Sequence, residues 1–403
     1  MSQDKDADAK STQQIHHGYV PAAGFAAVAP PLHRASTVLF KDVAAMRASH
    51  WLDKTTYTYG LHGTPTSFTL EARLATLEGG THAMLVPSGL AAIALVDQSL
   101  LSSGDAVLIP GNAYFPNKSL AAHELARWGI VHRFYDPMDV ESLRAALGED
   151  VRLVWIEPPG SVTLEFPDLR GLVRTVRAHA PRATVALDNT WGSGIAFDAF
   201  DLDPGATPAL GVDLTIHALT KYPSGGADVM MGSVVTRSQA LHDQLALTHC
   251  RLGLGVGPND VELVLRGLQT VALRYAAQDL ATRRIAQWAL GRKEFAAVLH
   301  PATPGSPGHE HWSAQCRAAA GLLTLAFDPA IAPDRIDRFV DDLRLFGIGW
   351  SWAGPMSLAV PYRPDSGRVG AYPGTLVRLS IGLEDVDDLI ADLEAALGRL
   401  AAG

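Results

Sequence analysis

The sequence predicts an α/β fold, in which a large, mostly parallel sheet is covered by helices on both faces and is followed by a smaller C-terminal α/β domain. The first observation is a series of short apolar runs in the middle of the chain, at residues 106–110, 153–156, 184–187 and 214–217. Such runs are typical of strands buried on both faces. The second observation is that helix-like segments separate the first three runs, as parallel strands require.

The helices are predicted from apolar residues that recur every three or four positions. In the first part of the chain we expect them at residues 67–79, 118–128, 140–147 and 169–179, with a short strand at 83–86. The C-terminal part contains a long helical stretch at 259–288, a strand at 321–327, a helix at 333–346 and a strand at 375–381. The final helix has the clearest apolar face, formed by Val386, Leu389, Ile390, Leu393, Leu397 and Leu400.

Composition narrows the class of protein. The 403 residues are 47% hydrophobic, carry a net charge of -9 and include two cysteines. No basic stripe is present, so nucleic acid is not an expected partner. The polar N-terminus has no signal-peptide pattern, and no apolar run is long enough for a transmembrane helix. Because the chain has no disulfide framework, we expect a cytoplasmic enzyme that binds neither membranes nor nucleic acid.

The chain is expected to have three parts. Residues 1–58 are polar and then mixed, and they predict an extended arm that packs on another subunit, with a partly disordered tail as the alternative. Residues 59–258 form the first domain and residues 259–403 the C-terminal domain. The connection between them, RLGLGVGP at 251–258, does not match the G-x-G-x-x-G dinucleotide fingerprint.

One stretch, residues 212–235, organises the rest. Two apolar runs flank Thr220, Lys221 and a Pro-Ser-Gly-Gly turn, which predicts strand, turn and strand. A lysine buried at such a junction has a lowered pKa and supplies the neutral amine that Schiff-base chemistry needs. The alternative is a lysine at a strand end with its ammonium in solvent.

Other strand ends bring further groups to the same edge. Asp188 follows the strand at 184–187, and Tyr114 lies in the loop after residue 110. Ligands bind beyond the carboxyl ends of parallel strands, so both are expected close to Lys221. The turn of Ser88, Gly89 and Leu90 opens a helix, where backbone N–H groups hold a phosphate. The alternative for Ser88 is a simple N-cap.

Several motifs together resemble the Cys/Met-metabolism pyridoxal-phosphate (PLP) enzymes. They are YGLHGT, LEGG, PSGLAAI, EPPGS, LDNTWGSG, LTKYPSGGAD and GTLVRLSIGLEDVDDLIADLEAAL, and the likeness runs from about residue 58 to the C-terminus. EPPGS, SWAG and IGLEDVDDLIADL favour the cystathionine β-lyase branch. The resemblance implies PLP fold type I (aspartate-aminotransferase-like), with residues 59–258 as the PLP-binding domain. It also implies a homotetramer built from pairs of subunits that share active sites.

The resemblance also implies roles. Lys221 resembles the Schiff-base lysine and proton carrier, Asp188 the acid at the pyridine nitrogen, and Tyr114 the ring that stacks on the cofactor. The remaining matches are the phosphate cup of Ser88, Gly89, Leu90 and Thr220, a tyrosine from the neighbouring subunit at Tyr59, and the substrate-binding residues Arg378, Ser351 and Trp352. The implied reaction cleaves L-cystathionine to homocysteine, pyruvate and ammonia.

Two departures keep alternatives open. Leu61 stands where the family usually has a phosphate-binding arginine, and Gly226-Ala227 replaces His-Ser before Asp228. Another cysteine S-conjugate as substrate, or γ-elimination or γ-replacement, therefore remains an alternative, as does a PLP-binding protein without activity. No metal site is expected, because His309, Glu310 and His311 are consecutive and are predicted to lie in a solvated loop.

Overall fold

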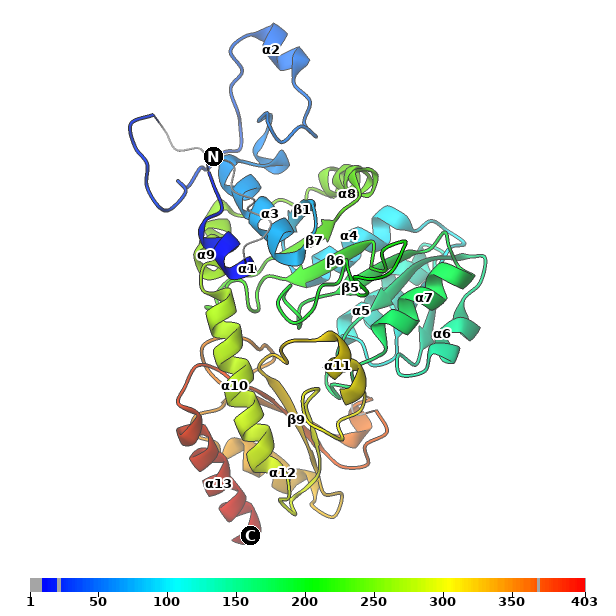
Figure 1. Ribbon diagram of the computed structural model, residues 1–403, viewed down its shortest axis with the longest axis vertical. Helices are drawn as coiled ribbons and strands as arrows, with labels where there is room; N and C mark the ends of the chain where they lie inside the picture. The colour runs from blue at the N-terminus through cyan, green and yellow to red at the C-terminus, as the bar shows by residue number, and fades with distance from the viewer. Residues whose placement is uncertain (1–8, 20–22, 368–369, 403) are drawn as a thin grey trace.

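The large sheet of the computed structural model has seven strands and confirms the predicted fold class (Figure 1). The structure describes residues 9–19, 23–367 and 370–402. The strand order is β1-β7-β6-β5-β4-β2-β3, and only β7 runs antiparallel to its neighbours. The strands are β1 (His82–Val86), β2 (Ala106–Pro110), β3 (Val131–Tyr135), β4 (Val151–Ile156), β5 (Thr184–Asp188), β6 (Leu214–Ala218) and β7 (Gly232–Thr236).

Helices cover both faces of this sheet, and alternate strand residues enter two separate cores. On β5, Val185 and Leu187 join the core that includes α3 and α7, whereas Ala186 joins the core that includes α4 and α8. The helices and helical turns of this part are η2 (Gly60–His62), α3 (Pro65–Glu78), α4 (Gly89–Leu100), α5 (Phe115–Leu120), η3 (Ala121–Leu125), α6 (Val140–Ala146), α7 (Leu169–His179) and α8 (Gln239–Leu252).

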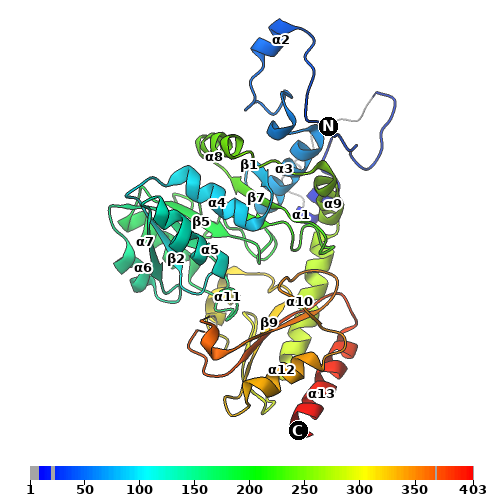
Figure 2. The ribbon, with the colours of Figure 1, turned by 180° about the vertical axis from the view of Figure 1, so that it is seen from behind.

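The second sheet has five strands in the order β10-β11-β12-β9-β8 and carries α10, α12 and α13 (Figure 2). Its strands are β8 (Phe295–Leu299), β9 (Leu322–Phe327), β10 (Gly347–Ile348), β11 (Leu358–Tyr362) and β12 (Leu376–Ser380). The helices of this half are α9 (Pro258–Leu268), α10 (Val271–Ala289), α11 (His309–Gln315), α12 (Pro333–Asp341), η4 (Pro364–Ser366) and α13 (Val386–Ala402). The domain boundary at residue 258 remains a prediction.

Some predicted elements differ from the structure. The helix expected at 259–288 is divided into α9 and α10, because the Gly267 carbonyl accepts hydrogen bonds from the Thr270 N–H (3.1 Å) and from Arg274 Nη2 (2.8 Å). The helix expected at 118–128 starts earlier, at Phe115, and its second half is the π-helix η3. His309–Gln315 forms α11 rather than a loop, anchored by the buried Trp312. No helix in the described parts of the chain has the length and apolarity that a bilayer crossing requires.

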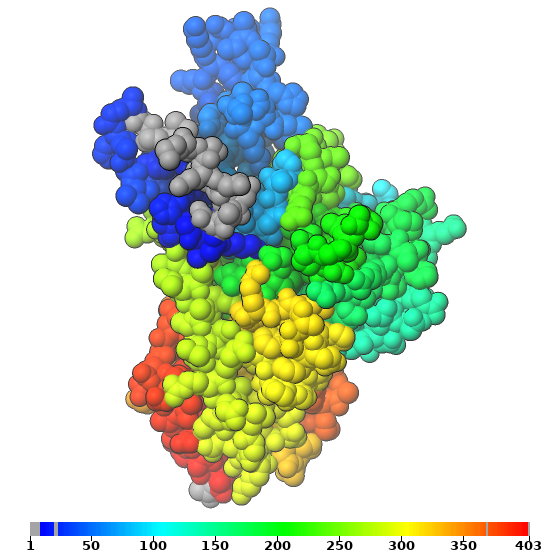
Figure 3. Space-filling model, viewed as in Figure 1, coloured from blue at the N-terminus to red at the C-terminus, as the bar shows by residue number. Residues whose placement is uncertain are grey.

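The N-terminal arm is held at one point and extends away at another. It contains two short helices, α1 (Lys10–Ile15) and α2 (Val43–Ala48). In both ribbon views α2 lies at the end of a segment that projects from the body of the molecule (Figures 1 and 2). The space-filling view shows the same projection above the two packed halves (Figure 3). Leu39 is 89% exposed on this segment.

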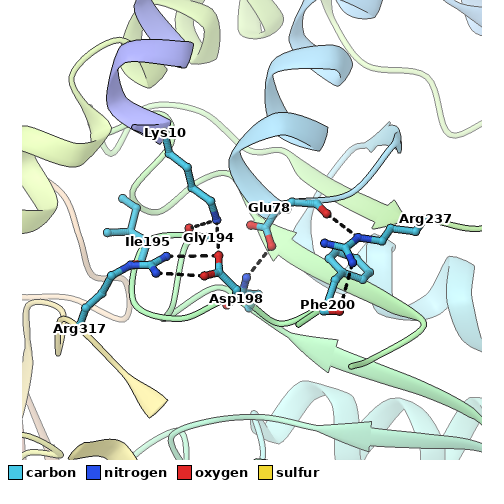
Figure 4. Close-up of polar contacts among 10 residues, drawn as sticks. Lys10, Glu78, Gly194, Ile195, Asp198, Phe200, Arg237 and Arg317 are labelled. Atoms are coloured by element: carbon cyan, nitrogen blue, oxygen red, sulfur yellow. Dashed lines mark hydrogen bonds and ion pairs between the residues drawn. The ribbon is translucent and has the colours of Figure 1, made fainter. Parts of the chain in front are cut away.

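Helix α1 is fixed by an ionic cluster centred on Asp198 (Figure 4). Lys10 Nζ lies 2.7 Å from Asp198 Oδ1 and donates to the Gly194 carbonyl at 2.9 Å. Arg317 Nη1 lies 3.0 Å from Asp198 Oδ2. Partial burial opposes the charge of Asp198, but Arg317 and Lys10 outweigh it and lower its pKa to about 2. The cluster therefore joins the arm, the first sheet domain and the C-terminal half.

Replacing this carboxylate should loosen the arm. We expect Asp198→Asn to lower the free energy of unfolding by about 1–2 kcal/mol, as measured with urea, because two cations lose their partner at a half-exposed site. The stabilisation is present above the ordinary aspartate pKa of about 3.9 and is lost as the pH falls toward about 2. Proteolysis near Lys10 should also become faster. Asp203→Asn, which removes one surface pair with Arg174, is the control. Equal effects of the two changes would contradict the bridging role.

Candidate active site

A cavity of about 1750 Å³ lies between the two sheets, at the carboxyl ends of β2, β4, β5 and β6. Every residue predicted for the site except Tyr59 lines it: Ser88, Gly89, Leu90, Tyr114, Asp188, Thr220, Lys221, Ser351, Trp352 and Arg378. The first seven come from the first sheet domain and the last three from the C-terminal half. The strand-end argument thus placed Tyr114, Asp188 and Lys221 correctly at this cavity, while the roles of all these residues remain predictions.

The first turn of α4 forms one end of the cavity. Ser88 caps the helix, and its Oγ accepts a hydrogen bond from the Ala91 N–H at 3.0 Å. A Cβ on Gly89 would lie only 2.7 Å from the Ala218 Cβ, and a Cβ on Gly232 would lie 2.3 Å from the Ser88 carbonyl oxygen. Glycine at both positions lets the backbones approach closely. The N–H groups at the start of the helix then suit an anion such as phosphate.

Lys221 lies in the turn that follows β6, and its amine is held inside the cavity. Its Nζ donates to Ser351 Oγ at 2.8 Å and lies 5.3 Å from the centroid of the Trp352 ring. Burial, reinforced by the charge of Arg378 and opposed by that of Asp188, lowers the Lys221 pKa to about 8. The predicted alternative of a solvated strand-end ammonium is therefore wrong. A substantial fraction of this amine is neutral near physiological pH.

Two buried carboxyl groups accompany this amine. Asp188 ends β5, and its Oδ1 accepts from the Thr190 N–H at 3.0 Å. Both oxygens of Glu157 lie within hydrogen-bond distance of the Tyr114 N–H, at 3.0 and 2.8 Å. Burial raises the pKa of each carboxyl, and the charge of Asp188 raises that of Glu157 further. Glu157 was missed in the sequence, although it follows the strand at 153–156 as Asp188 follows its own strand.

Arg378 approaches from the other sheet. It lies on β12, is 6% exposed, and its Nη1 donates to the Ser161 carbonyl at 3.1 Å. Its guanidinium carbon is 5.6 Å from the centroid of the Tyr362 ring. A planar guanidinium at the cavity wall matches a carboxylate in a bidentate manner. The cavity therefore combines the first turn of a helix, a buried amine, two buried carboxyl groups and a guanidinium.

The predicted residue Tyr59 lies outside the cavity. It is 47% exposed, pairs with Thr37 in an isolated bridge, and has its ring 6.0 Å from that of His62. Leu61, one of the two departures from the family pattern, lies against a separate, smaller pocket beside His62. The prediction that Tyr59 serves a neighbouring subunit is not tested by a single chain.

The lowered pKa of Lys221 has a direct consequence for its reactivity. In cofactor-free protein, acylation of Lys221 by acetic anhydride should increase with pH, reach half of its maximum near pH 8 and level off above that pH, because the neutral amine is the reactive form. Mass spectrometry of labelled peptides measures this, with the exposed Lys293 as the internal reference. A Lys221 profile that keeps rising to pH 10 would contradict the prediction.

Comparison with known proteins gives a consistent result. The family model described as Cys/Met metabolism PLP-dependent enzyme matches residues 11–398. Cystathionine beta-lyase MetC of Escherichia coli is 33% identical, over 96% of this chain and 98% of that protein. Cystathionine beta-lyase of Bordetella avium is 37% identical, over 94% of each chain. The crystal structure of Xanthomonas oryzae cystathionine gamma synthase in complex with cystathionine superposes with a TM-score of 0.87 at 31% identity, over 98% of this chain and 99% of that one.

Proposed function

The chain belongs to the Cys/Met metabolism PLP-dependent enzyme family, and from that premise we propose that it is a carbon–sulfur β-lyase that cleaves L-cystathionine. The observation that carries the proposal is the meeting of Lys221, Asp188 and Arg378 in one cavity. The relatives named cystathionine beta-lyase, at 33% and 37% identity, support this choice of reaction. The products are homocysteine, pyruvate and ammonia.

The cavity residues fit PLP. The first turn of α4, with Gly89 pressed against Ala218, suits the phosphate. The buried carboxyl of Asp188 suits the pyridine nitrogen, and the amine of Lys221, with its pKa of about 8, suits the aldehyde. When bound, PLP supplies an electron sink that stabilises negative charge at the substrate Cα.

Different residues of the cavity bind the substrate, move its proton and hold the cofactor. Arg378 binds the α-carboxylate of the substrate and orients the Cα–H bond. Lys221 removes the Cα proton in its neutral form, and the Ser351 hydroxyl, 2.8 Å away, holds the amine in place. With PLP bound, Asp188 would stabilise positive charge at the ring nitrogen, and Tyr114 would hold the ring by stacking. The thiolate departs from Cβ, and water then releases pyruvate and ammonia.

A second copy of the chain completes the site in this proposal. The segment around α2 carries exposed apolar side chains, with Val43 56% and Met46 48% exposed, and it projects from the body of the molecule. Packing on a neighbouring subunit would bury them and bring Tyr59 to that subunit's phosphate cup. We accordingly propose a homotetramer built from two such pairs, in the cytoplasm, with residues 59–258 and 259–403 as the two domains of each subunit.

The reaction type is tested with purified, PLP-saturated protein and L-cystathionine. Pyruvate together with homocysteine is the expected result, because β-elimination breaks the bond between Cβ and sulfur. 2-Oxobutyrate with cysteine would instead show cleavage at Cγ and place the protein among the γ-lyases. The similarity to a cystathionine gamma synthase structure is the reason to test for this outcome. Bound PLP without either keto acid would rule out cystathionine and leave another cysteine S-conjugate as the substrate.

Lys221→Ala should abolish both turnover and the visible absorption band of lysine-bound PLP.

The assignment of Arg378 has its own test. Arg378→Lys should raise the KM for L-cystathionine by about 10- to 100-fold, because a bidentate, charge-assisted contact with the substrate carboxylate is lost. The absorption spectrum of bound PLP should stay as in the wild type. Arg363→Lys is the matched control at the cavity rim, where Arg363 pairs with Asp334. An unchanged KM in Arg378→Lys would remove this residue from substrate binding.

A further inference from the structure

A buried polar cluster lies between α3 and the large sheet, beside Asp188 but outside the cavity lining. Its members are Glu78, the last residue of α3, Asn189, which follows β5, and His217 on β6. Their exposed fractions are 1%, 0% and 0%. Glu78 belongs to the LEGG motif, for which the proposed mechanism has no role.

The Glu78 carboxylate is fully engaged by the other two residues. Its Oε1 lies 2.9 Å from His217 Nδ1, and its Oε2 accepts from Asn189 Nδ2 at 2.5 Å. An ionised carboxylate without access to water is costly unless a cation or several donors compensate it. The His217 ring nitrogen and the Asn189 amide supply the two donors that this carboxylate requires.

The cluster connects directly to the backbone that carries Asp188. The Asn189 N–H donates to the Ile216 carbonyl at 2.8 Å, which joins the ends of β5 and β6. Side chains alternate along an extended strand, so Asp188 and Asn189 are expected to point in opposite directions. The Asn189 side chain reaches Glu78 on the α3 side, whereas Asp188 lines the cavity. Glu78 thus holds both strand ends at the residues next to Asp188 and Ile216.

The charges around Asp188 give the cluster a second effect. Burial raises the pKa of Asp188. Hydrogen bonds from Thr190, and to a smaller extent His217, lower this pKa, whereas the charge of Glu78 raises it slightly. On the other sides, Glu157 is a further buried carboxyl and Lys221 a cation. The pair of Glu78 and His217 is therefore the part of these surroundings that lies on the α3 side of Asp188.

We propose that Glu78 and His217 form a buried charge pair that positions Asp188 and keeps its carboxylate ionised for the pyridine nitrogen of PLP. This inference rests on the proposed function, in which Asp188 contacts that nitrogen. The two residues are positioning residues, since they touch neither the cavity nor the substrate. Their effect is on the strength and pH dependence of PLP binding.

The test measures the dissociation constant of PLP and the absorption spectrum of bound PLP between pH 6 and 9. In His217→Gln, the dissociation constant at pH 7 should rise about tenfold, since a change of one pKa unit at Asp188 corresponds to a tenfold change in equilibrium. The loss of PLP affinity should grow as the pH falls, because Asp188 takes up a proton more readily when its pKa is raised. The PLP dissociation constant of the double variant Glu78→Gln/His217→Gln should lie between those of His217→Gln and the wild type, because the double variant leaves no unpaired buried charge.

Two further variants separate the outcomes. His300→Gln also removes a fully buried histidine that does not line the cavity, and it should lower the melting temperature without affecting PLP binding. If His217→Gln does the same, the pair is merely structural and the inference is overturned. If His217→Gln does not fold, Glu78→Gln alone decides: a wild-type PLP affinity and pH profile would overturn the inference. Asp188→Asn is the reference: if it too leaves PLP binding unchanged, the proposed contact of Asp188 fails, rather than the role of the pair.

Discussion

The structure depends on placing one amine, that of Lys221, away from water at the edge of a parallel sheet. Water exclusion lowers its pKa to about 8, and the fold supplies groups that hold the amine inside the cavity. A hydroxyl, that of Ser351, and an aromatic ring, that of Trp352, do so. Both come from the C-terminal half, so the chemistry of the lysine requires the two sheets to be packed together.

Charge in this cavity is balanced by groups from both sides of the sheet. Asp188 and Glu157 are buried carboxyls whose pKa values are raised, and Lys221 and Arg378 are the cations that share the cavity with them. Behind the sheet lies the buried pair of Glu78 and His217. Electrostatic interactions weaken little in such a dry environment, and the proposed effect of this pair on Asp188 rests on that property.

The strand ends were the predictable part of the candidate site. Apolar runs identify β2, β4, β5 and β6, and the rule that ligands bind at the carboxyl ends of parallel strands then brings Tyr114, Asp188 and Lys221 together. Arg378, by contrast, lies in the middle of β12, where nothing in the local pattern distinguishes a cavity arginine from a surface one. It was assigned through resemblance to the family. Glu157 was overlooked although the same strand-end rule applied to it.

The sequence by itself determined most of the strands and helices, because burial on one face imposes a period along the chain and burial on both faces gives a continuous apolar run. It also determined the family, through motifs spread from YGLHGT to the last helix. Only the tertiary structure decided which side chains meet across elements: Lys221 with Ser351, and Glu78 with His217 and Asn189. These partners are separated by more than a hundred residues, and no local pattern encodes a contact that arises from packing one layer on another.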